Sequence, residues 1–287
     1  MTPLEASSPT GAGTVPLLAP AADVAPWLRF VLIGAAFFRR DLRSDFSYRL
    51  SFVLHALNIV LGVAAYYFLA RFVDRAALGG ADPFLFLLVG LAVNAYMSTW
   101  LVCFTDAIRT GQTTGTLKLI FASPLTRAQF MLFSGLYPSV RAALDGTVYL
   151  ISGWTLGAPL ANTNVAAAGM ILLVSSFAFA AIGIGSAAFA LVLKRGDPLL
   201  WLVTTLSWML GGVLYPIQLL PAPLHEAARL LPITHAVSGI RLAMAGEPIA
   251  DAAGPLMVFV IVAMPLSLAA FGAAVRRARM TGALGHV

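Results

Sequence analysis

A succession of long apolar stretches limits this chain to one class of fold. The stretches contain few charged residues and lie at 50–70, 83–105, 130–158, 165–193, 198–214 and 252–275. A helix needs about 20 apolar residues to cross a hydrocarbon core of roughly 30 Å. Across the chain 60% of residues are hydrophobic and 10% are charged, whereas soluble domains contain about 25% charged residues. We therefore predict an all-α polytopic membrane protein with six transmembrane helices.

The basic residues predict which side of the membrane each loop faces. Because six spans return the chain to its starting side, both termini lie together. If that side is the cytoplasm, the outer segments hold only Arg71, Arg75, Arg229 and Arg241, and the inner segments hold Arg29, Arg39, Arg40, Arg43, Arg49, Arg109, Lys118, Arg127, Lys194, Arg195, Arg276, Arg277 and Arg279. Cytoplasmic loops are enriched in Lys and Arg, so we expect both termini to be cytoplasmic. This asymmetry accounts for the net charge of +6 without a nucleic-acid partner.

The region before the first apolar stretch has two parts. The first is rich in Ala, Pro, Ser, Thr and Gly, which is typical of a disordered tail. In the second, aromatic residues such as Trp27 and Phe37 recur at helical spacing between arginines, as in an amphipathic helix at a membrane interface. The alternative, a first transmembrane span, would need a longer apolar run. The expected division is a cytoplasmic tail at 1–23, an interfacial helix at 24–45, a six-span membrane domain at 46–280 and a second cytoplasmic tail at 281–287.

An irregular segment at residues 211–241 follows the fifth apolar stretch. Tyr215 and Pro216 are expected to end that stretch after about 17 residues, or roughly 25 Å of helix, which barely crosses the membrane. Two short helical pieces follow, divided by Pro232, and Thr234 is expected to cap the second. Such backbone is tolerated at membrane depth only where it is buried in protein or lines a wet cavity. We expect a re-entrant helix pair in the outer membrane face, with a surface-lying external loop as the alternative.

This helix pair is a candidate gate at the outer face. Its candidate residues are Tyr215, Pro216, Pro221, Arg229, Pro232, His235 and Arg241. Hydrocarbon would penalise a charged arginine by several kcal/mol. A wet outer vestibule is therefore expected around Arg229 and Arg241.

A second segment, on the cytoplasmic side, could contact a partner protein. Residues 115–121 predict a short helix with Leu117, Ile120 and Phe121 on one face, which Pro124 follows. A rigid amphipathic helix in an inner loop has the shape needed to fit a groove of another protein. The alternative is a helix that lies on lipid headgroups.

Two charged residues fall inside the third apolar stretch. Arg141 and Asp145 are four residues apart, so they share one face of a helix. Ionisable groups inside membrane helices usually pair or line a pathway. Two interpretations stay open: polar groups that face a translocation route or a dimer interface, or a salt bridge that serves structure alone. His55, in the first stretch, is expected to be a satisfied helix-packing residue.

Both segments resemble the same family of membrane proteins. The outer segment has Gly212, Tyr215-Pro216, Leu220-Pro221, Leu231-Pro232, His235 and Arg241, and the inner segment has Gly115, Thr116, Leu117, Ser123, Pro124 and Leu125. These motifs are similar to those of ABC type-2 permeases, the membrane subunits of ATP-binding-cassette exporters. The sequence departs from the family at Thr113 and Lys118, where acidic residues are typical.

The resemblance implies a fold, a location and partners. It implies an interfacial first helix, a re-entrant pair after the fifth span, and a coupling helix whose residues here are Gly115, Thr116, Leu117, Lys118, Phe121 and Pro124. The expected location is a bacterial inner membrane, in contact with lipid. The expected assembly is a homodimer with two copies of a cytoplasmic ABC ATPase.

The energy source must come from outside this chain if transport is driven by ATP. A phosphate-binding loop requires G-x-x-x-x-G-K-[ST], and the only lysines, Lys118 and Lys194, each follow a leucine. We therefore expect no cofactor, metal or catalytic residue in this chain, with ATP and Mg²⁺ bound by the partner ATPase. The resemblance implies that the function is export of a glycan, a glycolipid or another amphipathic molecule. The alternative is an ion-coupled secondary transporter or channel without an ATPase, although intramembrane acids are scarce.

Overall fold

The computed structural model describes residues 25–47, 49–78, 80–117, 126–160, 162–193 and 198–280. Within these ranges the chain is helical and contains no strand. The α-helices are α1 (Pro26–Ser47), α2 (Arg49–Ala70), α3 (Pro83–Thr113), α5 (Arg127–Thr155), α6 (Val165–Leu193), α7 (Pro198–Leu210), α8 (Ala222–Arg229), α9 (Pro232–Ala245) and α10 (Ala250–Met280). Two short 3-10 helices, η2 (Ala76–Leu78) and η3 (Ile217–Leu219), lie in the connections.

Four of the described helices are long and apolar enough to cross a membrane. They cover Leu50–Ala70, Pro83–Thr113, Val165–Val192 and Ala250–Met280. The third and fifth predicted spans correspond to α5 and α7. Helix α5 has 29 residues but is less apolar than these four, and α7 has only 13 residues. The structure thus gives an all-helical membrane protein with four candidate spans in the described ranges.

The prediction that Tyr215 and Pro216 end the fifth apolar helix is wrong. Helix α7 ends earlier, at Leu210. Gly212 has a φ of 70°, in the left-handed region that glycine enters at low cost. A side chain at Gly211 would clash with the Ser207 carbonyl oxygen and Ile233. The two glycines therefore end the helix before the chain reaches the proline.

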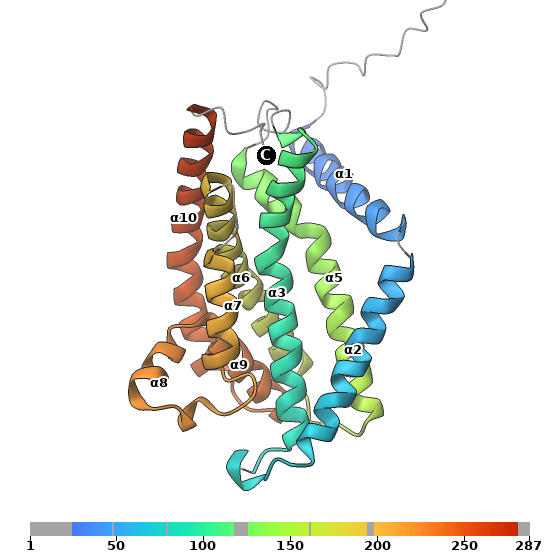
Figure 1. The fold of residues 1–287 in the computed structure, drawn as a ribbon. Coiled ribbons are helices and arrows are strands. Elements are labelled where there is room, and N and C mark those ends of the chain that lie inside the picture. Colours follow the sequence, from blue (N-terminus) through green and yellow to red (C-terminus); the bar gives the residue numbers. More distant parts are fainter. Residues whose placement is uncertain are drawn as a thin grey trace, which may run out of the picture.

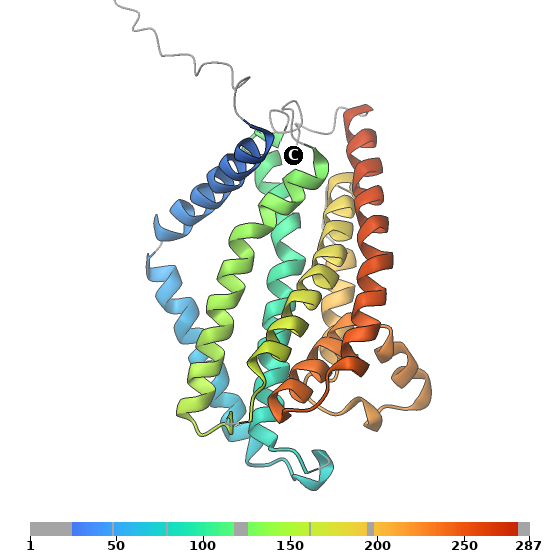
Figure 2. The same ribbon diagram turned by 180° about the vertical axis from the view of Figure 1, so that it is seen from behind.

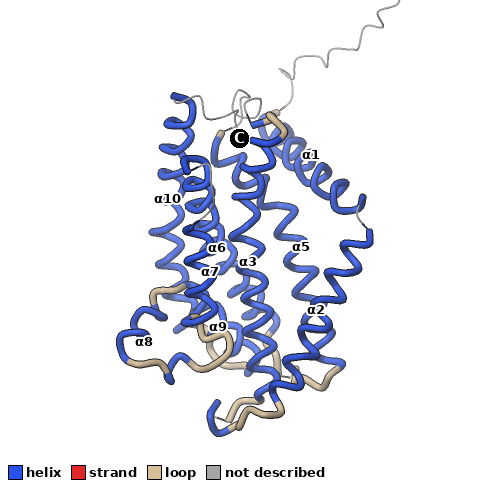
Figure 3. The backbone as a smooth tube through the Cα atoms, in the orientation of Figure 1, coloured by secondary structure: helices blue, strands red, loops and turns tan. Residues whose placement is uncertain are grey.

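The long helices form a bundle with two distinct ends (Figures 1 and 2). One end holds the start of α1 and the last turns of α3 and α10, and the opposite end holds the α2–α3 connection, α8 and α9. Most of the loop backbone lies at this opposite end (Figure 3). Helix α6 packs against α3, α9 and α10. The core beside the second end includes Met97, Phe179, Val237 and Leu256.

Candidate functional site

Arg241 fixes the linker between α7 and η3, residues 211–216. Its Nη1 donates to the Gly212 carbonyl oxygen at 2.9 Å, and its Nη2 donates to the carbonyl oxygens of Phe86 at 2.9 Å and Val213 at 3.2 Å. The guanidinium carbon lies 3.3 Å from the centroid of the Phe86 ring. Gly212 and Val213 follow Leu210, the last residue of α7, so their carbonyls belong to the linker and not to the helix. A cation from α9 therefore holds the linker after α7 against α3.

Gly90 allows the backbone of the linker to lie close against α3. A Cβ atom at this position would clash with the Val213 carbonyl oxygen and would lie 2.9 Å from the Val213 carbonyl carbon. Such backbone cannot move aside as the end of a side chain can. The sequence does not single out Gly90 or Phe86 as functional residues. The one signal for Gly90 is an isolated glycine in a helical pattern, which often marks a close packing contact.

Other predicted gate residues join the linker to the two short helices. The Tyr215 hydroxyl donates to the Met209 carbonyl oxygen, close to the end of α7. His235 Nε2 lies 2.8 Å from the Arg229 carbonyl oxygen, at the end of α8. Pro216 precedes η3. These contacts tie the end of α7 to the linker and the end of α8 to α9.

The second short helix begins earlier than the sequence predicted. The proposed cap at Thr234 is wrong because α9 already starts at Pro232, where the missing N–H costs nothing. The Thr234 hydroxyl instead donates to the Ala228 carbonyl oxygen at 2.7 Å. Pro221 directly precedes α8. Each short helix therefore begins at or just after a proline, and Thr234 joins the two helices.

The two arginines of this segment have different surroundings. Arg229 is exposed, and its Nη1 lies 3.6 Å from the Glu226 carboxylate. The guanidinium of Arg241 lies against backbone carbonyls and has a buried Nε. Neutral carbonyl dipoles therefore solvate Arg241. The wet vestibule expected around the two charges stays a prediction.

The inner segment is anchored to the bundle by Leu117. This side chain is fully buried, in the same apolar cluster as Ile108 of α3 and Phe130 of α5. Gly115 has a φ of 69°, which turns the chain after α3, and Thr116 is exposed. Leu117 therefore faces the interior and is not available to a partner. The other predicted coupling residues, Lys118, Phe121 and Pro124, lie outside the described residues.

Helix α5 begins after the inner segment with a capping box. The Thr126 hydroxyl accepts a hydrogen bond from the Gln129 backbone N–H, and the Gln129 side chain accepts one from the Thr126 N–H. This capping box satisfies two backbone donors that the helix leaves unpaired. The described residues on either side of the inner segment are thus a buried leucine before it and a capped helix after it.

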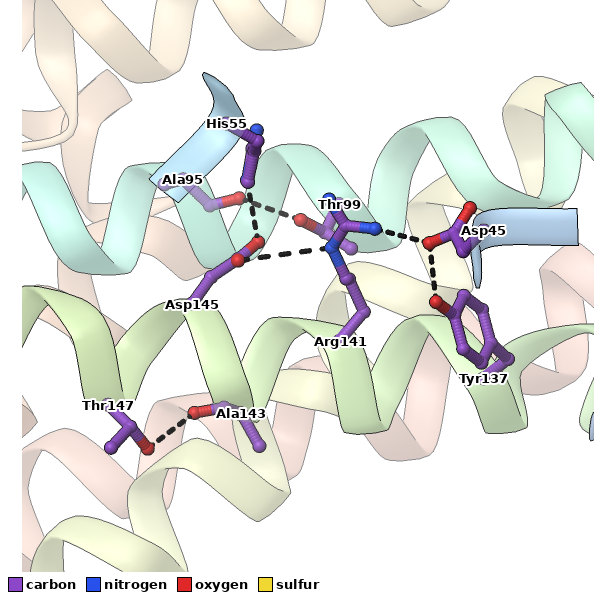
Figure 4. Close-up of polar contacts among 9 residues, drawn as sticks. All are labelled: Asp45, His55, Ala95, Thr99, Tyr137, Arg141, Ala143, Asp145 and Thr147. Carbon is purple, nitrogen blue, oxygen red and sulfur yellow. Dashed lines mark hydrogen bonds and ion pairs between the residues drawn. The ribbon is translucent and has the colours of Figure 1, made fainter. Parts of the chain in front are cut away.

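Arg141 and Asp145 belong to a polar network that joins three helices (Figure 4). Arg141 and the Tyr137 hydroxyl both donate to the Asp45 carboxylate at the end of α1. Asp145 Oδ2 lies 3.0 Å from His55 Nε2 on α2. Arg141 Nε lies 3.9 Å from Asp145 Oδ1.

The nearest partners of this charged pair therefore come from other helices. The predicted i,i+4 pair exists, but it is the longest contact of the network. Sequence spacing could not reveal Asp45, because it precedes Arg141 by 96 residues. Asp45 lies five residues before the first apolar stretch, and this position does not indicate that its partner lies on α5. The network ties α1 and α2 to α5.

The described residues offer no group of three or more His, Cys, Asp or Glu side chains that could hold a metal ion. They form a bundle of apolar helices, with a buried leucine at the start of the inner segment, two short helices at the opposite end and a charge network between helices. These features define a polytopic helical membrane protein.

Comparison with known proteins identifies the family. Residues 29–245 match the family described as ABC-2 type transporter, and the chain belongs to this family. The match begins within α1 and ends at the last residue of α9, so it includes the inner segment, the charge network and both short helices.

Two curated relatives are named Nodulation protein J. The protein from Rhizobium leguminosarum bv. trifolii is 30% identical over 102 residues, which is 34% of this chain and 39% of the relative. The protein from Rhizobium leguminosarum bv. viciae is 27% identical over 160 residues, which is 54% of this chain and 60% of the relative. Each alignment thus spans less than two thirds of the relative's length.

Proposed function

We propose that this chain is the permease subunit of an ATP-driven exporter. It acts as a homodimer with two copies of a cytoplasmic ABC ATPase in a bacterial inner membrane. It moves a glycan, a glycolipid or another amphipathic molecule out of the cytoplasm or inner leaflet by alternating access. The observation that carries this proposal is the family match over residues 29–245.

The inner segment is the proposed contact with the ATPase. Helices α3 and α5 meet there, at the bundle end that also holds the start of α1 and the end of α10 (Figure 1). Basic residues such as Arg39, Arg109 and Arg276 belong to elements of this end, which supports a cytoplasmic orientation with both termini inside. Gly115 and Thr116 are exposed. A force on this segment would pass through Leu117 into α3 and α5.

Helices α8 and α9 form the proposed re-entrant pair at the outer face, and α5 and α7 complete six spans. Helix α7 has 13 residues, which is about 20 Å at 1.5 Å per residue and too short to cross alone. Helix α9 has Ile233, Ala236 and Val237 buried and packs against α3, α6 and α10. A surface-lying external loop would not be packed on three helices, so the packing favours the re-entrant interpretation.

Copurification tests the proposed assembly. The chain would be tagged and coexpressed with the ABC ATPase encoded nearest to it, then purified in detergent and weighed by native mass spectrometry. We expect a complex of two permease and two ATPase chains. Purification of this chain alone as a stable monomer, with no ATPase retained, would contradict the proposal and favour an ion-coupled transporter or channel.

A further inference from the structure

A cavity lies beside Arg241 at the bundle end opposite the inner segment. It has a volume of about 530 Å³ and lies between the start of α3, the linker after α7, and α9. Small-molecule sites in proteins typically have volumes of about 300–1,000 Å³. Among the described residues that line it, Arg241 is the only charged one, and none is acidic.

The charge of Arg241 is not neutralised by any carboxylate of the described chain. Its three hydrogen bonds all go to neutral backbone carbonyls. A guanidinium has five N–H donors, and the Nε of Arg241 is buried without a partner. In contrast, Arg141 and Arg229 each have an acidic residue within 4 Å. Arg241 is partly buried, and charged groups withdrawn from water are normally paired.

The remaining lining suits a polar ring attached to an apolar group. Gln218 and Ser238 are exposed in the cavity and carry an amide and a hydroxyl. Ile217 and Leu219 supply apolar surface, and the Phe86 ring lies beneath the guanidinium. Arginine favours carboxylate and phosphate groups because its N–H donors match their oxygens.

We propose that this cavity binds a single anionic group, a carboxylate or a phosphate, on the molecule that the permease exports, with Arg241 as the charge that selects it. The proposal rests on the export function above and narrows its cargo to anionic molecules. The same chemistry could come from an acidic sugar or from the headgroup of a phospholipid.

Binding of two matched probes to the purified full-length chain tests this site. The probes are 4-nitrophenyl β-D-glucuronide and 4-nitrophenyl β-D-glucoside, which differ by a carboxylate in place of a hydroxymethyl group. Ligand-observed NMR would give both dissociation constants. We expect the glucuronide to bind at least about tenfold more tightly, since one charged hydrogen-bonded contact distinguishes the probes. Equal binding of both probes by the unmodified chain would overturn the proposal.

Variants assign the preference to Arg241. Arg241→Gln should abolish the preference for the glucuronide. Because it also removes the ties to the linker, a second pair of variants is needed. Ser238 lies three residues before Arg241 on α9, so Ser238→Glu places a carboxylate beside the cation, whereas Ser238→Gln adds the same bulk without charge. The glucuronide should bind at least about tenfold more weakly to Ser238→Glu than to Ser238→Gln.

The control is Arg229→Gln, which removes an exposed arginine outside the cavity lining and should keep the preference. A preference that survives in Arg241→Gln or Ser238→Glu would contradict the assigned site. Nanodiscs distinguish the two sources of the anion. If phosphatidylglycerol displaces the glucuronide and phosphatidylcholine does not, the site takes a lipid headgroup; if neither displaces it, the site takes an acidic sugar. These measurements need no ATPase, so they can fail while the copurification test succeeds, and the reverse also holds.

Discussion

Replacement of Gly90 by alanine should loosen the junction between α3, α9 and the linker after α7. The new Cβ would lie 2.9 Å from the Val213 carbonyl carbon and 3.1 Å from its Cα, whereas nonbonded carbons prefer about 3.5–4.0 Å. The linker must therefore move away from α3. That movement weakens the hydrogen bonds from Arg241 to Gly212 and Val213.

The size of the effect follows from three contributions. Overpacking in a core costs about 1–3 kcal/mol, and loss of one hydrogen bond to a charged group costs about 1.5–3 kcal/mol. The better helix propensity of alanine returns about 1 kcal/mol. We expect a net loss of about 2–4 kcal/mol, which lowers Tm by about 5–10 °C for a chain of this size.

The assay is thermal unfolding of the purified protein in detergent. Gly169→Ala is the control, because Gly169 lies in α6 and a Cβ there meets nothing within 4 Å; its Tm should stay unchanged or rise. The double variant Gly90→Ala with Arg241→Gln should lose less than the sum of the two single losses, since both disturb the same contact. Equal Tm values for Gly90→Ala and Gly169→Ala would refute this reasoning.

Three further outcomes are expected. Arg141→Met should lower the free energy of unfolding by about 1–3 kcal/mol, because Asp45 and Asp145 lose their shared partner inside the network. The control Arg229→Met, at an exposed pair, should change it by no more than about 0.5 kcal/mol. Similar Tm values for the two variants would contradict the network. Leu117→Asp should lower the yield of folded protein because it buries a carboxylate. Thr116→Arg, at an exposed position, should fold normally but copurify with less ATPase. Normal folding of Leu117→Asp would contradict the anchoring role of Leu117. In a chain with Cys103 replaced by serine, a single cysteine at position 222 should react with a membrane-impermeant thiol reagent in intact cells, and one at position 116 should not. The reverse pattern would overturn the proposed cytoplasmic location of both termini.

Features set by local sequence could be predicted. The apolar stretches correctly located the long helices, and Pro232 divides the two short helices as predicted, although it begins α9 where Thr234 was expected to cap it. The end of α7 is not where Pro216 predicts it, because the Gly211-Gly212 pair ends the helix first. The left-handed backbone at Gly212 decides the helix end, and any L-residue with a side chain would adopt it only with strain.

Features set by distant contacts could not be predicted. Leu117 has the spacing of an outward amphipathic face, yet its side chain is buried against α3 and α5. The partner of Arg141 lies on α1, and the acceptors of Arg241 lie on α3 and after α7. A sequence shows that a charge needs a partner, whereas only the packing of helices shows which group provides it.

ATP-dependent transport in proteoliposomes tests the central claim most directly. The chain and its ATPase would be reconstituted together, and efflux of the cargo would be followed with ATP, with a non-hydrolysable ATP analogue, and with an imposed proton gradient alone. Our account predicts transport only with hydrolysable ATP and only when both proteins are present. Transport driven by the ion gradient in vesicles that hold this chain without the ATPase would contradict it.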